Sequence, residues 1–278
     1  MHWDTFVTAG IPIATRDRPP GVQETVFQAT AATLIYGNKD AVLVDTFMTT
    51  WQANALADWV ESKRKNLATI YITHGHGDHW FGIATLLERF PNAKAVATTG
   101  TIEAARQNAD PEVLATVWKA SFPNQIPDNL VLPQALTGNV IDLEGDELVP
   151  VELGHTDTDN TTCLYVPSIG LVVAGDAAYN DVHLYLAQSD AKKRLEWIAA
   201  LNTIEALRPR AVVASHKRPG NDDKPAIIEE TRQYIRDFDR LVEATSTTQE
   251  LYDKMLALYP HRVNPSWALW SSARSAKP

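Results

Sequence analysis

The sequence contains very little cysteine. Cys163 is the single cysteine among 278 residues, so an intramolecular disulfide is excluded. It lies in the apolar run TTCLYVPS, where a thiol is more often a buried strand residue than a zinc ligand. We expect Cys163 to be buried in a strand of a chain that is long enough to form a large core.

Positive charge is also scarce, and long apolar runs are missing. Lys and Arg number 25 against 34 Asp and Glu, and no concentrated basic run offsets the net charge of −9. Nucleic acid is therefore not an expected partner. No segment approaches the roughly 18 apolar residues of a membrane span, and residues 1–21 do not resemble a signal peptide. The sequence predicts a soluble, cytoplasmic protein with a small-molecule substrate and no membrane partner, and leaves a homo-oligomer open.

Strand and helix patterns alternate along the chain. Residues 22–47 read as two strands joined at a Gly-Asn turn, and helical and β-rich runs then alternate up to residue 120. A second β-rich stretch covers residues 139–176, and residues 222–278 read as mostly helical. The Pro-containing segment 122–136 is expected to be a mobile or pocket-lining loop. We expect one domain over residues 1–278, for which a four-layer αββα sandwich is plausible.

The stretch HGHGDH, residues 74–79, carries the densest chemistry in the sequence. His74 and His76 follow an apolar strand and are two residues apart, so their side chains can reach one metal ion. Asp78 and His79 can serve a second metal beside it. Gly75 and Gly77 are expected to provide backbone angles that other residues cannot adopt. A polar turn is the alternative, but turns rarely carry three imidazoles.

Further candidate ligands follow other apolar runs. His155 follows VPVELG, Asp176 ends GLVVAGD and His216 follows AVVAS. Taken singly, each histidine could be a capped loop residue and Asp176 a helix cap. Their joint placement favours ligands, and nitrogen and oxygen donors without thiolate suit zinc. Asp45, which ends AVLVD, is expected to support a ligand histidine or the loop rather than to bind metal.

These motifs resemble the metallo-β-lactamase-fold hydrolases, including lactonases and hydroxyacylglutathione hydrolases with a bridging aspartate. The resemblance rests on Asp45, THGHGDHWFG, GHT at 154–156, AGD at 174–176 and SH at 215–216. It implies an αββα sandwich with two Zn²⁺ ions per chain. It also implies three sets of ligands: His74, His76 and His155 for one metal; Asp78, His79 and His216 for the other; and Asp176 between them. Relatives often continue GHT with Pro-Gly, whereas this chain has DTDN, so the loop beside the metal site and the substrate rim are expected to differ from theirs.

A two-metal site predicts hydrolysis. Two cations lower the pKa of a bridging water from 15.7 toward about 7, which provides a nucleophile without serine or cysteine. Asp78 could orient this hydroxide and accept its proton. Lactonases of this family place a tyrosine three residues after the bridging aspartate, as Tyr179 stands here, which implies a hydrogen bond to the substrate carbonyl. His183 is a weaker catalytic candidate, and packing is the alternative for both.

The predicted reaction is the opening of a lactone or lactam. A glutathione thioesterase resembling hydroxyacylglutathione hydrolase is one alternative, and a mononuclear-iron persulfide dioxygenase is another. Trp267 and Trp270 have the spacing of one face of a short helix, although a pocket roof or a subunit contact would also suit them.

Overall fold

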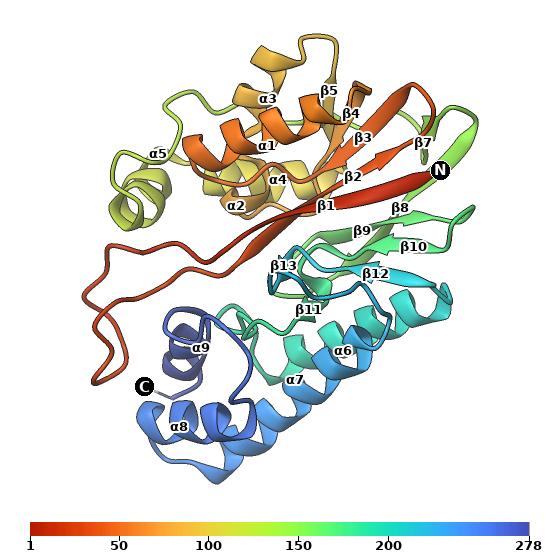
Figure 1. Cartoon of the computed structure of the whole chain (residues 1–278). Coiled ribbons are helices and arrows are strands. Elements are labelled where there is room, and N and C mark those ends of the chain that lie inside the picture. Colours follow the sequence, from red (N-terminus) through yellow and green to blue (C-terminus); the bar gives the residue numbers. More distant parts are fainter. Residues whose placement is uncertain (278) are drawn as a thin grey trace.

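The computed structural model describes residues 1–277 as two facing sheets with helices on both outer sides (Figure 1). The first sheet has the strand order β1-β2-β3-β4-β5-β6. Its strands are β1 (His2–Thr8), β2 (Thr30–Tyr36), β3 (Asp40–Val44), β4 (Asn66–Tyr71), β5 (Lys94–Ala97) and β6 (Gln134–Ala135). The pairs β1–β2 and β2–β3 are antiparallel, and the pairs from β3 to β6 are parallel.

The second sheet has the order β12-β10-β9-β8-β7, and a short parallel pair, β11–β13, lies beside it. The strands are β7 (Ile141–Leu143), β8 (Asp146–Gly154), β9 (Thr161–Val166), β10 (Leu171–Val173), β11 (Tyr179–Asn180), β12 (Ala211–Val213) and β13 (His216–Lys217). Cys163 is fully buried in β9, as expected.

Helices cover the outer face of each sheet. Those of the first half are α1 (Thr50–Ser62), α2 (Gly77–Trp80), α3 (Ile83–Arg89), α4 (Thr99–Asn108), α5 (Pro111–Val113) and the π-helical turn η1 (Leu114–Lys119). Those of the second half are η2 (Gly175–Ala177), α6 (Ala191–Ala206), α7 (Ile227–Ala244), α8 (Thr248–Leu258) and α9 (Ala268–Ala276). No helix within residues 1–277 is long and apolar enough to span a membrane.

Three apolar layers hold this arrangement together, because neighbouring strand residues point to opposite faces. Ile35 and Val213 pack between the two sheets. Leu34, one residue earlier, packs with the core that includes Leu56 of α1, and Val212 packs with Trp197 of α6. Both faces of both sheets are thus buried, which confirms the αββα sandwich.

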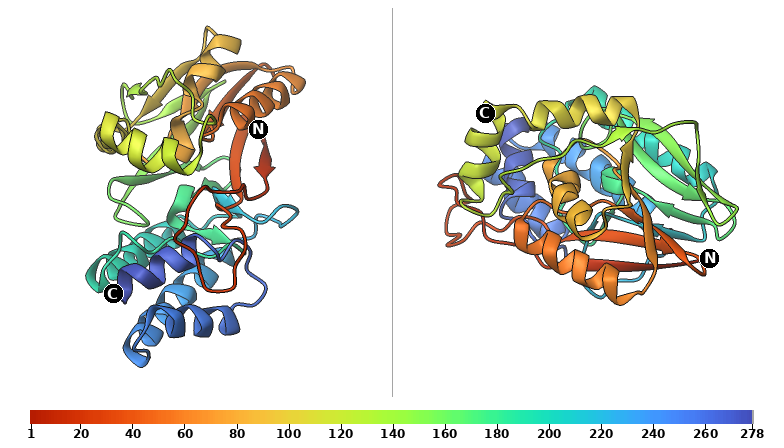
Figure 2. Two further views of the ribbon diagram at one scale, coloured as in Figure 1. Left: turned by 90° about the vertical axis from the view of Figure 1, so that its left-hand side faces the viewer. Right: turned by 90° about the horizontal axis from the view of Figure 1, so that it is seen from above.

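The long loop after β1 meets the C-terminal part of the chain at one side of the molecule (Figure 1). The loop of residues 9–29, between β1 and β2, extends from the first sheet toward α9 (Figures 1 and 2). There the indole of Trp270 donates to Asp17, and the ring of Phe27 lies 4.6 Å from that of Trp267. The loop therefore brings Asp17 and Phe27 into contact with the two C-terminal tryptophans.

Candidate metal centre

The HGHGDH loop follows β4, and its glycines are needed for close packing. A Cβ atom on Gly75 would lie 2.5 Å from the Cβ of Ala104, and one on Gly77 would lie 2.4 Å from the ring of Phe81. Neither glycine has a positive φ, so the expectation of special backbone angles was wrong. The absence of side chains lets the loop lie directly against α4 and Phe81.

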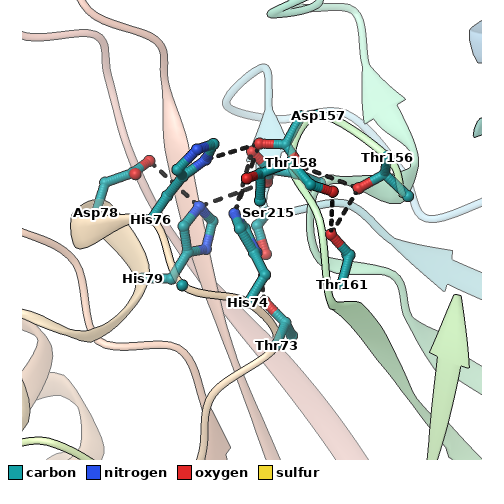
Figure 3. Close-up of polar contacts among 12 residues, drawn as sticks. Thr73, His74, His76, Asp78, His79, Thr156, Asp157, Thr158, Thr161 and Ser215 are labelled. Atoms are coloured by element: carbon teal, nitrogen blue, oxygen red, sulfur yellow. Dashed lines mark hydrogen bonds and ion pairs between the residues drawn. The ribbon is translucent and has the colours of Figure 1, made fainter. Parts of the chain in front are cut away.

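The first group of candidate ligands combines two histidines and two aspartates. One ligand atom from each of His74, His76, Asp157 and Asp176 lies within 4.8 Å of the others. Asp157 Oδ2 is 2.8 Å from His76 Nδ1 and 3.7 Å from His74 Nε2 (Figure 3). These side chains come from the loops that follow β4, β8 and β10, so the fold brings them together at one edge of the sandwich.

The second group consists of Asp78, His79 and His216. Asp78 Oδ2 is 3.3 Å from His79 Nε2 and 3.5 Å from His216 Nε2. Asp78 and His79 lie on the short helix α2, and His216 begins β13. All three side chains are buried.

Asp176 lies between the two groups. Its Oδ2 is 3.0 Å from His216 Nε2 and 3.9 Å from His74 Nε2, and its Oδ1 is 3.6 Å from His79 Nε2. The preceding Gly175 has a φ of 57°, and a Cβ there would lie 2.9 Å from the Thr73 hydroxyl oxygen. Glycine at this position therefore permits the turn that directs Asp176 inward.

Several buried polar atoms of the two groups form no hydrogen bond. They are His74 Nε2, His79 Nε2, Asp78 Oδ2 and Asp176 Oδ1. An unsatisfied buried polar group costs about 1–3 kcal/mol, and more when it is charged, so such a concentration needs an explanation. Nitrogen and oxygen donors that converge on shared points fit divalent cations.

The electrostatics of the centre also suit cations. Burial would raise the pKa of Asp78, but the neighbouring His79 and His216 lower it to about 2. Burial would also raise the pKa of Asp176, but the same two histidines hold this pKa well below its usual range. Burial lowers the pKa of His74 to about 4. Burial would lower the pKa of His76, His79 and His216, but the neighbouring carboxylates outweigh it and raise the pKa of each. A bound cation would take the place of these protons, because ionised carboxylates and neutral imidazoles are the forms that bind metal ions.

Asp45 supports the centre from behind. Its Oδ2 lies 2.9 Å from His79 Nδ1 and accepts hydrogen bonds from the hydroxyls of Thr73 and Ser215. Its Oδ1 accepts from the backbone N–H of Thr73, at the start of the histidine loop. These contacts confirm the expected supporting role, because they orient a candidate ligand and fix the loop.

The structure does not bring His155 into the metal centre. His155 Nδ1 lies 2.6 Å from Asp159 Oδ1, and its Nε2 lies 2.8 Å from the hydroxyl of Ser189. Both ring nitrogens are thus engaged outside the two groups, and the expectation of a His155 ligand is corrected. Spacing alone did not reveal that the ring turns toward Ser189.

Asp157 takes the position that His155 was expected to fill. The pairing of β8 with β9 shifts between Glu152 and Gly154, and Gly154 has a φ of 77°. The chain then turns so that Asp157 points inward, and the hydroxyl of Thr156 donates to its Oδ1 at 3.0 Å. The departure from Pro-Gly at DTDN was the signal in the sequence that could have identified Asp157.

Tyr179 and His183 do not line the cavity above the centre. The Tyr179 hydroxyl donates to Asp176 Oδ2 at 3.1 Å, and its ring stacks on His216 at 5.2 Å. His183 Nδ1 lies 2.9 Å from the hydroxyl of Tyr234. Both side chains are fully buried. The expectation that either contacts a substrate is corrected, because neither is exposed to the space where a substrate would bind.

A cavity of about 300 Å³ opens onto the metal centre. Its floor includes His76, Asp78, Asp157, Asp176 and His216. Its walls are formed by Ile13, Phe27, Gln28, Asn108, Val113, Val117, Trp118, Ser121, Phe122, Tyr185, Gln188 and Trp267. An apolar cavity with a polar floor is the usual form of a small-molecule site.

Known proteins resemble this chain in both sequence and fold. A family model described as Metallo-beta-lactamase superfamily matches residues 26–216. A metallo-β-lactamase family protein from Thermus thermophilus has a TM-score of 0.66 at 20% identity, covering 98% of this chain and 91% of that one. A metallo-β-lactamase from Pontibacter korlensis has a TM-score of 0.60 at 16% identity, covering 84% and 100%.

One group of curated relatives matches locally. A hydroxyacylglutathione hydrolase from Francisella tularensis subsp. holarctica is 36% identical over 67 residues. The match spans 24% of this chain and only 25% of that enzyme. It therefore covers about a quarter of each protein.

Proposed function

Because the chain belongs to the metallo-β-lactamase superfamily, we propose that it is a dinuclear zinc hydrolase that opens a cyclic ester or amide, a lactone or lactam. The observation that carries the proposal is the pair of buried histidine and carboxylate groups, joined by Asp176, beneath a largely apolar cavity. Zinc accepts such mixed nitrogen and oxygen ligand sets.

The ligand set that we propose differs from the expected one at a single residue. His74, His76 and Asp157 would hold the first zinc ion, and Asp78, His79 and His216 the second. Asp176 would bridge the two, since its two oxygens face different groups. When bound, the zinc ions would lower the pKa of water and polarise a carbonyl oxygen.

The chain's own residues would perform the remaining steps. Asp78 lines the cavity and is held ionised, so it can orient an attacking water and accept its proton. Tyr185 lines the cavity and lies near His76, with 6.2 Å between ring centroids. Burial raises the pKa of Tyr185, so its hydroxyl stays protonated and can donate to a developing oxyanion.

Tyr179 has a different role in this proposal. Its hydroxyl donates to Asp176, and its pKa is raised well above the usual value by burial and by the Asp176 charge. A protonated phenol in this position fixes the orientation of the carboxylate that would bridge the metals. Tyr179 is thus a positioning residue.

A glutathione thioesterase is the second candidate, and the local match to hydroxyacylglutathione hydrolase favours it. Both candidates use the same metal centre, so only the substrate separates them. The mononuclear-iron dioxygenase alternative is less favoured, because two groups of side chains each offer ligand atoms for a cation.

The test measures metal content and turnover together. The purified protein should contain close to two zinc ions per chain and open lactones in a panel of lactones, lactams, thioesters and aryl esters. Asp176→Ala should lose at least one metal ion and most activity while remaining folded. One iron per chain with persulfide-dependent oxygen uptake would refute the proposal, and preferential cleavage of S-acyl glutathione would favour the second candidate.

A further inference from the structure

The described lining of the cavity contains acidic side chains but no lysine or arginine. Among residues 1–277, no lysine or arginine lines the cavity, and its carboxylates are Asp78, Asp157 and Asp176 of the metal centre. Two cations at the start of α6 are paired: Lys193 Nζ lies 3.1 Å from Asp159, and Arg194 Nε lies 2.5 Å from Asp239. A negatively charged substrate group would therefore find no cationic side chain in the cavity wall.

The walls instead offer flat apolar surfaces. Trp267 stacks on Tyr185 with 4.9 Å between ring centroids and an angle of 5°. Phe27 lies against the same indole, and its ring is 5.4 Å from that of Phe122. Trp118 of η1 adds a further indole to the wall. Such aromatic walls favour an uncharged ring or branched apolar group.

The third carboxylate lowers the charge of the centre itself. Two divalent cations carry four positive charges, and Asp78, Asp157 and Asp176 neutralise three of them. With a neutral histidine in place of Asp157, the same centre would keep one more positive charge. Asp157 therefore reduces the attraction of the cavity floor for an anionic substrate.

We infer that the substrate is electrically neutral and carries a compact aromatic or apolar group next to its ester. This inference rests on the proposed function and narrows it to neutral lactones and related esters. Glutathione thioesters and carboxylate-bearing β-lactams are excluded as good substrates. A cavity of about 300 Å³ is at the lower end of the range for small-molecule sites, which also favours a compact substrate.

The first experiment compares substrates that differ by one charge. Hydrolysis of dihydrocoumarin is measured against that of dihydrocoumarin bearing a ring carboxylate, with the zinc-loaded protein. The neutral lactone should have at least about a tenfold higher kcat/KM, a difference of about 1.4 kcal/mol. Equal or faster hydrolysis of the anionic lactone would overturn the inference.

A variant pair tests whether the cavity wall causes this preference. Val117 lines the cavity and is 50% exposed, so Val117→Arg places a guanidinium at its rim without opening the core. This change should raise kcat/KM for the anionic lactone and narrow the preference several-fold. Val140→Arg is the matched control, because Val140 is exposed at a site that does not line the cavity. A preference that Val117→Arg leaves unchanged would contradict an origin in the cavity.

A binding measurement separates this inference from the proposed function. Calorimetry on the zinc-loaded protein compares 4-chromanone, which has no hydrolysable bond, with chromone-2-carboxylate. Tighter binding of 4-chromanone supports a neutral ligand even if no lactone is opened, in which case the proposed function alone fails. Tighter or equal binding of the carboxylate, or binding of neither at millimolar concentration, overturns the inference.

Discussion

Asp157 and His155 are two residues apart and both buried, but their side chains contact different groups. The Asp157 carboxylate is fully buried beside His74 and His76, and burial that would raise its pKa is outweighed by these two histidines, which lower it. The His155 ring contacts Asp159 and Ser189 instead. Which of the two side chains binds metal therefore decides the charge of the whole centre.

Exchange of each residue for asparagine should distinguish them. Asp157→Asn removes a candidate ligand charge, so we expect zinc content to fall by about one ion per chain and zinc affinity to drop by at least about tenfold. His155→Asn should keep both ions. Metal analysis after equilibrium dialysis measures the difference, with circular dichroism as the control for folding. Loss of zinc from His155→Asn alone would reinstate the imidazole as the ligand.

The two tyrosines near the centre should also respond differently. Tyr185 lines the cavity, so Tyr185→Phe should reduce kcat by roughly tenfold to a thousandfold with zinc content unchanged. Tyr179→Phe removes the donor to Asp176 and should weaken zinc binding by about tenfold or more. Kinetics at saturating zinc and zinc titrations separate the two effects. Native kcat in Tyr185→Phe would rule out its role as a donor.

At the scale of elements, the segment between β11 and α6 is attached to α7 through a buried histidine. Burial and the nearby Arg262 lower the pKa of His183 to about 3. In the unfolded chain the value returns to about 6.5, so between these two pH values the unfolded state binds a proton that the folded state does not. The free energy of unfolding should therefore fall as pH decreases through this window.

His183→Gln should remove this contribution while an amide can still bond to Tyr234. Urea unfolding measures the free energy of unfolding between pH 7 and pH 4.5. In the variant this free energy should fall less steeply with decreasing pH than in the original protein, by up to about 1.4 kcal/mol per pH unit. His261→Gln is the matched control, since His261 is exposed. An unchanged pH slope in His183→Gln would show that His183 is not responsible.

The regular elements could be predicted from the sequence because their periodicity is local. The β2–β3 hairpin, α1 and α7 all lie within stretches whose pattern predicted strands or helices. The edge strands β1 and β6 were not predicted, since β1 depends on its pairing with β2 and β6 has two residues within a Pro-containing segment. Edge strands gain their definition from neighbours rather than from their own pattern.

At the scale of the molecule, six of the seven predicted ligands are brought together, because parallel or adjacent strands end at one edge. The cavity walls could be predicted only in part: Phe122 lies in the segment 122–136 that was expected to be mobile or to line a pocket, and a pocket roof was the alternative for Trp267. Phe27 and Trp267 are far apart in sequence and meet only in the folded chain. The two C-terminal tryptophans have different environments: Trp267 lines the cavity, whereas Trp270 is buried against Tyr252 in the core that includes Trp197.

The meeting of Phe27 with Trp267 also bears on biosynthesis. All the candidate ligands precede residue 217, so a nascent chain that has emerged to that point already carries every donor for metal. The indole that forms one wall of the cavity is translated about fifty residues later. A nascent chain therefore carries every candidate ligand before it carries Trp267, so the metal centre can be assembled before this wall of the cavity.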